Sequence, residues 1–114
     1  MMEALIVVDI QEGLVKLGPA NKEEYIVKVK ETISSFEEAG KEIIYIRHTE
    51  SEGFLSEGDP SWSIYHELSP RPQDKIFNKN FNSSIIISSS NCSISIYRKI
   101  FSFSCNFTNY KFFI

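Results

Sequence analysis

The sequence has no acidic residue after Asp74, and residues 85–114 also contain no glycine, proline, alanine, valine or leucine. Natural α/β domains use these small and aliphatic residues heavily, so the tail does not continue the design of the preceding chain. Residues 1–84 hold all 15 acidic residues and 9 of the 12 lysines and arginines, a net charge of −6, whereas residues 85–114 carry +3. We therefore predict an ordered part of a domain in residues 1–84 and an atypical, poorly structured tail in residues 85–114.

Other absences exclude whole classes of function. The net charge of −3 leaves no basic footprint for nucleic acid. No apolar run is long enough to cross a membrane. The first residues include no basic leader, so we predict no signal peptide and a cytoplasmic protein. The two cysteines, Cys92 and Cys105, do not have the close spacing of a metal site, and in a reducing cytosol they are expected to be free thiols.

Three short apolar runs predict the strands of a parallel sheet. Residues 4–8 form a continuous, largely β-branched run, which is typical of a strand buried on both faces. Residues 42–47 read as a second strand, and residues 75–78 as a third and shorter one. A long polar segment with several glycines and prolines separates the second strand from the third, and loops of that length are usually functional.

The segment between the first two strands predicts one long helix. Apolar residues recur at helical spacing across residues 21–39, with charged residues mostly off that stripe. Asn21 and Glu24 are spaced as an N-terminal capping box, and Gly40 is placed as the residue that ends the helix. Strand, helix and strand in this order make a βαβ unit, so the fold class is α/β with a parallel sheet.

Polar residues follow each predicted strand at its carboxyl end: Asp9, His48 and Lys79. Ligands of open parallel sheets bind at this edge, so we predict that the three residues converge there. Asp9 is either a functional carboxylate or one that accepts backbone N–H bonds in the next turn. His48 is a binding residue or a loop histidine bonded to the backbone, and Lys79 alone could be a solvated charge.

Four pieces of the sequence, in order, resemble the isochorismatase-like cysteine hydrolases. They are Ala4-Leu5-Ile6-Val7-Val8-Asp9-Ile10-Gln11-Glu12-Gly13, Ile43-Ile44-Tyr45-Ile46-Arg47-His48-Thr49, Trp62-Ser63-Ile64-Tyr65-His66-Glu67-Leu68 and Pro72-Gln73-Asp74-Lys75-Ile76-Phe77-Asn78-Lys79. The resemblance covers about residues 4–84. It implies a three-layer α/β/α, Rossmann-like fold, of which the chain supplies a truncated, N-terminal part.

The resemblance also implies roles for individual residues. Asp9 would be the general base, Lys79 its electrostatic partner, and Gln11 and His48 substrate-binding residues. The reaction would be thiolate attack on a small amide or, in isochorismatase proper, a vinyl ether, through a covalent intermediate. An Asp, a Lys and a thiol suit this chemistry, since the carboxylate accepts the thiol proton and the ammonium favours the thiolate.

The nucleophile of these hydrolases is a cysteine at the start of a later helix, and we expect neither cysteine of this sequence to replace it. Cys92 and Cys105 lie 13 and 26 residues after Lys79, which is too early, and neither follows an apolar strand and a glycine turn. The chain as written should therefore be inactive.

The resemblance to the family ends near residue 84, and the amino-acid composition changes at the same place. This coincidence suggests that a change of reading frame near codon 85 replaced the rest of the protein. Reading the gene beyond codon 75 in all three frames decides the matter. Another frame that encodes an apolar strand, a glycine turn and a cysteine would support the hypothesis, and the lack of one would mean a genuine tail.

Two other functions and a metal site are alternatives to a hydrolase. A non-catalytic remnant could bind a ligand, or a full-length homologue through its open sheet edge. A phosphoryl-transfer enzyme of the haloacid dehalogenase type needs a second Asp where Gln11 stands. The Asp-x-His pair of metal-binding relatives is absent, and although His48, Glu50 and His66 could be combined on paper, we predict no metal and no cofactor. The resemblance implies a small-molecule substrate as the partner of the full-length family, and a second copy is the other candidate partner, since relatives commonly self-associate.

Overall fold

The computed structural model of the protein describes residues 2–18, 20–80, 86–88, 92–97, 99–105 and 111–113. The elements, in chain order, are β1 (Met2–Val8), α1 (Glu12–Lys16), α2 (Lys22–Glu38), β2 (Glu42–His48), β3 (Lys75–Lys79), β4 (Ile86–Ser88), β5 (Cys92–Tyr97), β6 (Ile100–Cys105) and β7 (Lys111–Phe113). The three strands and the long helix predicted from the sequence are confirmed, and the fold class is α/β. No helix among the described residues is long and apolar enough to cross a membrane.

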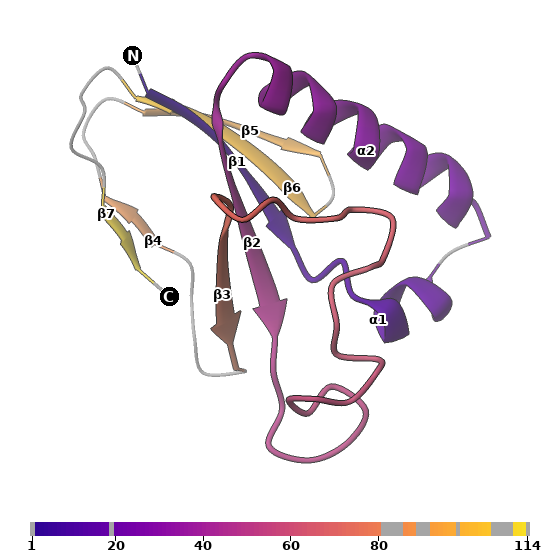
Figure 1. Ribbon diagram of the computed structural model, residues 1–114. Coiled ribbons are helices and arrows are strands. Elements are labelled where there is room, and N and C mark those ends of the chain that lie inside the picture. The colour runs from indigo at the N-terminus through magenta and orange to yellow at the C-terminus, as the bar shows by residue number, and fades with distance from the viewer. Residues whose placement is uncertain are drawn as a thin grey trace.

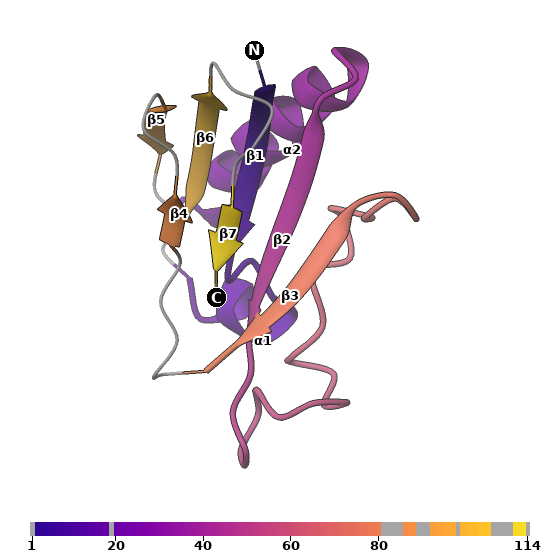
Figure 2. The same cartoon turned by 90° about the vertical axis from the view of Figure 1, so that its left-hand side faces the viewer.

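The main sheet has five strands in the order β3-β2-β1-β6-β5 (Figures 1 and 2). β1, β2 and β3 are parallel, as predicted, whereas β6 pairs antiparallel with β1 and β5 antiparallel with β6. The sheet is therefore mixed. β5 and β6 lie in the tail that we predicted to be poorly structured, and their alternation of Ile or Phe with Ser has the period of a strand.

Helix α2 ends as the sequence predicts, and Asn21 is its N-cap residue as predicted, but the expected capping bond is absent. Gly40 has φ +71°, its N–H donates to the Glu37 carbonyl, and the N–H of Lys41 donates to the Phe36 carbonyl. This pair of bonds is a Schellman motif, which requires the left-handed conformation that glycine adopts at little cost. The predicted capping box is wrong, because the side chain of Asn21 makes no capping hydrogen bond.

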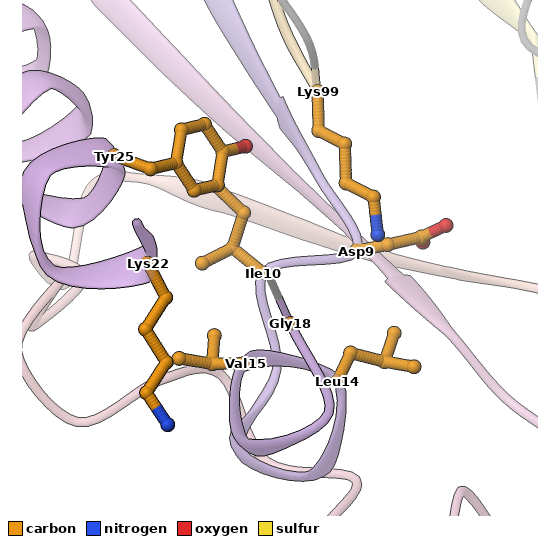
Figure 3. A pocket seen from close by; sticks show the side chains of 8 residues that line it. All are labelled: Asp9, Ile10, Leu14, Val15, Gly18, Lys22, Tyr25 and Lys99. Atoms are coloured by element: carbon orange, nitrogen blue, oxygen red, sulfur yellow. The ribbon is translucent and has the colours of Figure 1, made fainter. Parts of the chain in front are cut away.

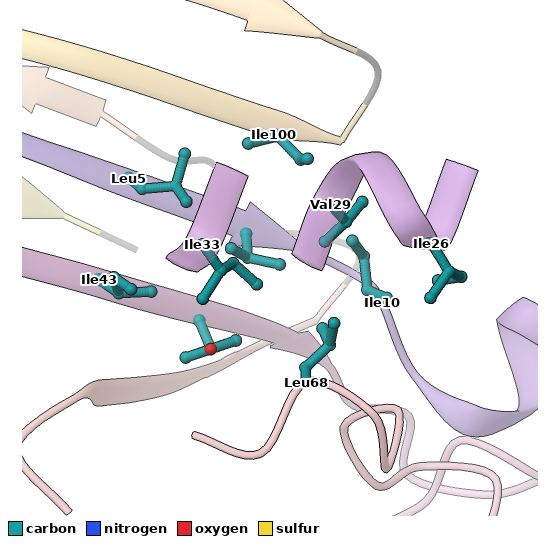
Figure 4. Packing of buried hydrophobic residues seen from close by; sticks show 10 residues of the cluster. Leu5, Ile10, Ile26, Val29, Ile33, Ile43, Leu68 and Ile100 are labelled. Atoms are coloured by element: carbon teal, nitrogen blue, oxygen red, sulfur yellow. The ribbon is translucent and has the colours of Figure 1, made fainter. Parts of the chain in front are cut away.

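The core lies between α2 and one face of the sheet (Figure 4). The buried face of α2 packs on β1 and β2, whose apolar runs are buried almost without interruption. The two-stranded ribbon of β4 and β7 lies on the other side of the sheet (Figures 1 and 2). The buried cluster comprises Leu5, Val7, Ile10, Ile26, Val29, Ile33, Ile43, Tyr45, Leu68 and Ile100.

The long segment between β2 and β3 contains no helix, but contacts with its neighbours hold it in place. The guanidinium of Arg47 lies 3.5 Å from the centre of the Trp62 ring, and the Trp62 indole N–H donates to the Thr49 hydroxyl at 2.9 Å. Burial lowers the pKa of Arg47 from its ordinary value. Further along, Arg71 forms ion pairs with Glu37 of α2, at 3.0 Å, and with Asp74, at 2.8 Å. These contacts hold the segment in place beside the carboxyl edge of the sheet.

Tyr45 leads to a prediction about stability and its pH dependence. Its side chain is 2% exposed, and its hydroxyl has no hydrogen-bond partner among the described residues. Tyr45→Phe should raise the free energy of unfolding by about 1 kcal/mol, because it removes a buried, unsatisfied polar group. Burial also raises the pKa of Tyr45, so above pH 10 only the unfolded state ionises there and stability falls with rising pH.

Urea unfolding at neutral pH and above pH 10 measures both effects. At neutral pH the Tyr45→Phe variant should have the higher free energy of unfolding. Above pH 10 its free energy of unfolding should fall less steeply than that of the parent. Tyr65→Phe is the matched control, since a hydrogen bond to Glu67 raises the pKa of Tyr65 and its loss should bring a small destabilisation. A Tyr45→Phe protein that is less stable than the parent would contradict the prediction.

Candidate active site at the carboxyl edge of the sheet

Backbone hydrogen bonds align the carboxyl ends of the three parallel strands. Asp9 follows β1, and its N–H donates to the Ile46 carbonyl of β2 at 2.9 Å. His48 and Lys79 end β2 and β3, are paired in register, and are held by the Thr49 N–H, which donates to the Lys79 carbonyl at 2.7 Å. The three residues predicted to converge therefore lie side by side.

The side chains of these residues form one cluster. The ammonium of Lys79 lies 3.3 Å from Oδ2 of Asp9 and 3.4 Å from Nδ1 of His48, and the Lys79 side chain is only 16% exposed. Because an ammonium only donates, Nδ1 of His48 is the acceptor in this contact. In a neutral ring the proton then sits on Nε2, which faces Oε1 of Glu50 at 3.6 Å. Lys79 thus bridges the Asp9 carboxylate and the His48 ring.

Asp9 is held in an uncommon conformation. Its φ is +56°, in the left-handed region that few residues other than glycine adopt. Its Oδ1 is buried and has no hydrogen-bond partner among the described residues, so the alternative of a carboxylate satisfied by backbone N–H groups is not supported at this atom. Strained backbone and an unused acceptor concentrate at functional sites, so both features favour the functional reading of Asp9.

Gln11 links the site to the rest of the fold. It is fully buried, and its amide donates to the His48 carbonyl at 3.0 Å and to the Trp62 carbonyl at 2.7 Å. Its oxygen accepts the His48 N–H at 2.8 Å. Both amide hydrogens are therefore used within the protein, and the side chain holds the end of β2 and the long segment against β1.

Two clefts meet at Asp9. One, of about 490 Å³, is lined by Asp9, Leu14, His48, Glu50, Phe54, Leu55, Lys79, Asn80 and Lys99. The other, of about 380 Å³, is lined mainly by apolar residues between α1 and α2, together with Asp9, Lys22, Tyr25 and Lys99 (Figure 3). Both volumes are in the range of small-molecule sites.

Lys99 is a site residue that the sequence did not reveal. It lines both clefts, and Figure 3 shows its side chain extending toward Asp9. Its carbonyl accepts the N–H of Val8 at 2.8 Å, which fixes it beside the end of β1. No sequence signal could have placed it, because its position depends on β6 pairing with β1.

Other titratable and nucleophilic residues lie apart from this cluster. His66 is exposed, and its Nδ1 lies 2.8 Å from Oε1 of Glu12. Among the described residues no group of three metal-ligating side chains exists. Cys105 is paired in register with Met2, at the opposite end of β1 from Asp9. Met2 and Asp9 are seven positions apart along the strand, which corresponds to about 23 Å.

The fold and this edge cluster define a class of α/β protein with a site outside the carboxyl ends of its strands. The chain matches the isochorismatase domain family over residues 3–91. It belongs to the isochorismatase family.

Solved structures agree with the family assignment. A crystal structure of an isochorismatase family protein is 27% identical, with a TM-score of 0.58 over 68% of this chain and 46% of that one. A proposed hydrolase of the family from Chromobacterium violaceum ATCC 12472 is 22% identical, with a TM-score of 0.54 and coverage of 72% and 45%. An isochorismatase from Pseudomonas putida KT2440 is 19% identical, with a TM-score of 0.57 and coverage of 66% and 40%.

The chain therefore spans less than half the length of the solved structures that it matches. No similar sequence was found among curated proteins.

Proposed function

We propose that this chain carries the Asp–Lys half of a cysteine hydrolase site and has no hydrolytic activity by itself. The observation that supports this most directly is the contact of 3.3 Å between the Lys79 ammonium and the Asp9 carboxylate. The unused Oδ1 of Asp9 and its strained backbone add to it. Cytoplasmic location and the absence of a cofactor belong to the same proposal and rest on the sequence patterns alone.

In the proposed reaction Asp9 accepts the proton of a cysteine thiol, and the Lys79 ammonium stabilises the thiolate and the negative charge that develops on the substrate. With an amide, the thiolate attacks the carbonyl carbon, the amine leaves with the proton held by Asp9, and water hydrolyses the resulting thioester to a carboxylic acid and the free thiol. A vinyl ether would likewise pass through a covalent intermediate that water hydrolyses, with the alcohol as the leaving group. His48 would contact the substrate, while Gln11 would position His48 rather than touch the substrate itself. The thiol must come from outside the edge cluster, because Cys105 is paired at the far end of β1.

Ligand binding tests the part of the site that the chain contains. Titration with a panel of small carboxamides and carboxylates, followed by NMR shifts, should locate binding at the cleft of Asp9 and Lys79. Lys79→Met should weaken binding about tenfold or more, since it removes a donor of charge-assisted hydrogen bonds. Lys28→Met is the matched control, because Lys28 is exposed on α2 and lines neither cleft.

Hydrolysis assays with the same panel should show no turnover by the 114-residue chain. Turnover that disappears in Cys92→Ala or Cys105→Ala would overturn the proposal. Binding that is unchanged in both Lys79→Met and Asp9→Asn would remove its structural basis. Asn adopts the left-handed conformation about as readily as Asp, so the second variant removes the charge without adding to the backbone strain at this position.

A non-catalytic binding module is the second candidate. The two clefts favour it, because they are lined by three lysines, Lys22, Lys79 and Lys99, and by only two carboxylates, Asp9 and Glu50, and this excess of positive charge could hold a small anion without any nucleophile. The hypothesis of a changed reading frame near codon 85 also remains a proposal. If another frame restores the family's cysteine, the hydrolase reading applies to the restored protein. If no other frame does so, the hypothesis of a non-catalytic binding module is the one to test.

A further inference from the structure

The two cysteines of the chain, which the proposed function does not use, are placed opposite each other by the β5–β6 hairpin. β5 ends at Tyr97 and β6 begins at Ile100, so two residues connect them. The pairing runs without a break from Tyr97↔Ile100 to Cys92↔Cys105. Cys92 and Cys105 thus share one register position in an antiparallel pair.

The kind of register position matters for a disulfide. Residues that flank a two-residue connection form a hydrogen-bonded pair, as in a β-turn. Hydrogen-bonded and non-hydrogen-bonded pairs alternate along antiparallel strands. Counting from Tyr97↔Ile100 makes Cys92↔Cys105 a non-hydrogen-bonded pair, for which the Cα atoms lie about 4.5 Å apart. That separation is within the range that a disulfide spans, about 4.4–6.8 Å.

We infer that Cys92 and Cys105 form a reversible disulfide across the β5–β6 hairpin when a small-molecule disulfide is present as oxidant. The thiolate of one cysteine attacks the small disulfide, expels one small thiolate and leaves a mixed disulfide. The thiolate of the other cysteine attacks the protein sulfur of that bond and expels the second small thiolate. The cysteines give up two electrons to the small disulfide, and their two protons end on the two thiols released.

The bond would hold the hairpin closed. It links the residues at the open end of β5 and β6 and closes a loop of about 14 residues, which should shift the opening equilibrium of the hairpin by a factor on the order of 100. β6 is also the partner of β1, so the disulfide would stabilise the antiparallel side of the main sheet. Hydrogen exchange of the β5 and β6 amides should slow in the oxidised chain and return to its former rate with reductant.

Mass spectrometry of the full chain tests the inference directly. The chain is equilibrated with mixtures of reduced and oxidised glutathione, quenched in acid, alkylated and digested with trypsin without reduction. Trypsin cuts after Lys79, Arg98, Lys99 and Lys111, so the two cysteines leave on separate peptides, 80–98 and 100–111. The expected product is these two peptides joined by a disulfide, from a monomeric chain. Alkylation of both cysteines, or mixed and intermolecular disulfides in place of the joined pair, would overturn the inference.

A variant in which one cysteine is moved by one position tests whether strand register, and not only closeness along a flexible chain, brings the two thiols together. The double variant Cys92→Ser with Ser93→Cys moves the thiol by one position, which changes the sheet face it belongs to. The loop to Cys105 is shortened by only one residue, so a flexible chain would close both loops about equally well. We expect the disulfide of the natural pair to form at a ratio of oxidised to reduced glutathione that is at least about tenfold lower than the ratio that the shifted pair needs. Equal closure by the two chains would show that the register is not what brings the cysteines together.

Discussion

Replacing Gln11 by leucine is expected to lower the free energy of unfolding by about 3–5 kcal/mol, because the three hydrogen bonds of its buried side chain are lost together. Leucine fills a similar volume but cannot replace the three hydrogen bonds that Gln11 makes with the N–H and carbonyl of His48 and with the carbonyl of Trp62. Each buried group that loses its partner costs about 1–3 kcal/mol. Since domains of this size are stable by only about 5–15 kcal/mol, the variant should unfold at far lower denaturant concentration or not fold at all.

Chemical denaturation of the parent and Gln11→Leu chains measures this loss. Gln73→Leu is the matched control, since Gln73 is exposed and the same substitution there should change stability by less than about 0.5 kcal/mol. A Gln11→Leu chain as stable as the control would mean that the Gln11 bonds do not hold this edge of the sheet. In a variant that still folds, the NMR signals of His48 and Lys79 should shift, because Gln11 sets the backbone position of His48.

Gly13→Ala is expected to destabilise the protein by about 2 kcal/mol, although alanine in a helix usually gains about 1 kcal/mol over glycine. Gly13 lies in α1, where a Cβ atom would come within 2.6 Å of the Ser61 Cβ and 2.8 Å of the Phe54 ring. The Phe54 ring can turn away, but Ser61 cannot retreat easily, because its carbonyl accepts the Gly13 N–H at 2.9 Å. The clash is therefore expected to outweigh helix propensity.

Two further chains show whether contact or propensity decides the effect of Gly13→Ala. Ser34→Ala, at an exposed position of α2, should gain a few tenths of a kcal/mol from propensity alone. Adding Ser61→Gly to Gly13→Ala removes the closest contact and should recover about 1 kcal/mol. A stabilising Gly13→Ala, or no recovery in the double variant, would show that the long segment does not press on α1 as the structure has it.

The results for Gln11 and Gly13 bear on function as well as stability. Both residues join the start of the chain to the long segment after β2, and that segment supplies Glu50, Phe54 and Leu55 to the larger cleft. The candidate site is thus built on packed elements and not on free loops. Weakening either contact should therefore also weaken ligand binding at Asp9.

The sequence by itself determined the elements and the edge at which the site lies. Apolar runs and helical spacing are local patterns, so they predicted the three parallel strands, α2 and the Gly40 terminus. The carboxyl ends of parallel strands share an edge, and this rule alone is enough to predict that Asp9, His48 and Lys79 lie together. The order of motifs along residues 4–84 then pointed to the family.

Only the tertiary structure decided what depends on contacts between distant segments. Gln11 forms hydrogen bonds with residues that lie 37 and 51 positions later in the chain. No local pattern in the sequence could therefore have shown that it holds these segments together. The strained φ of Asp9 is imposed by its surroundings, and the side chain of Asn21 need not cap α2 because other contacts hold that helix. Lys99 reaches the site, and Cys92 is paired in register with Cys105, because β6 pairs with β1 and β5 with β6. Strand partners and register are fixed by backbone hydrogen bonds and side-chain packing between segments, which composition and periodicity do not encode.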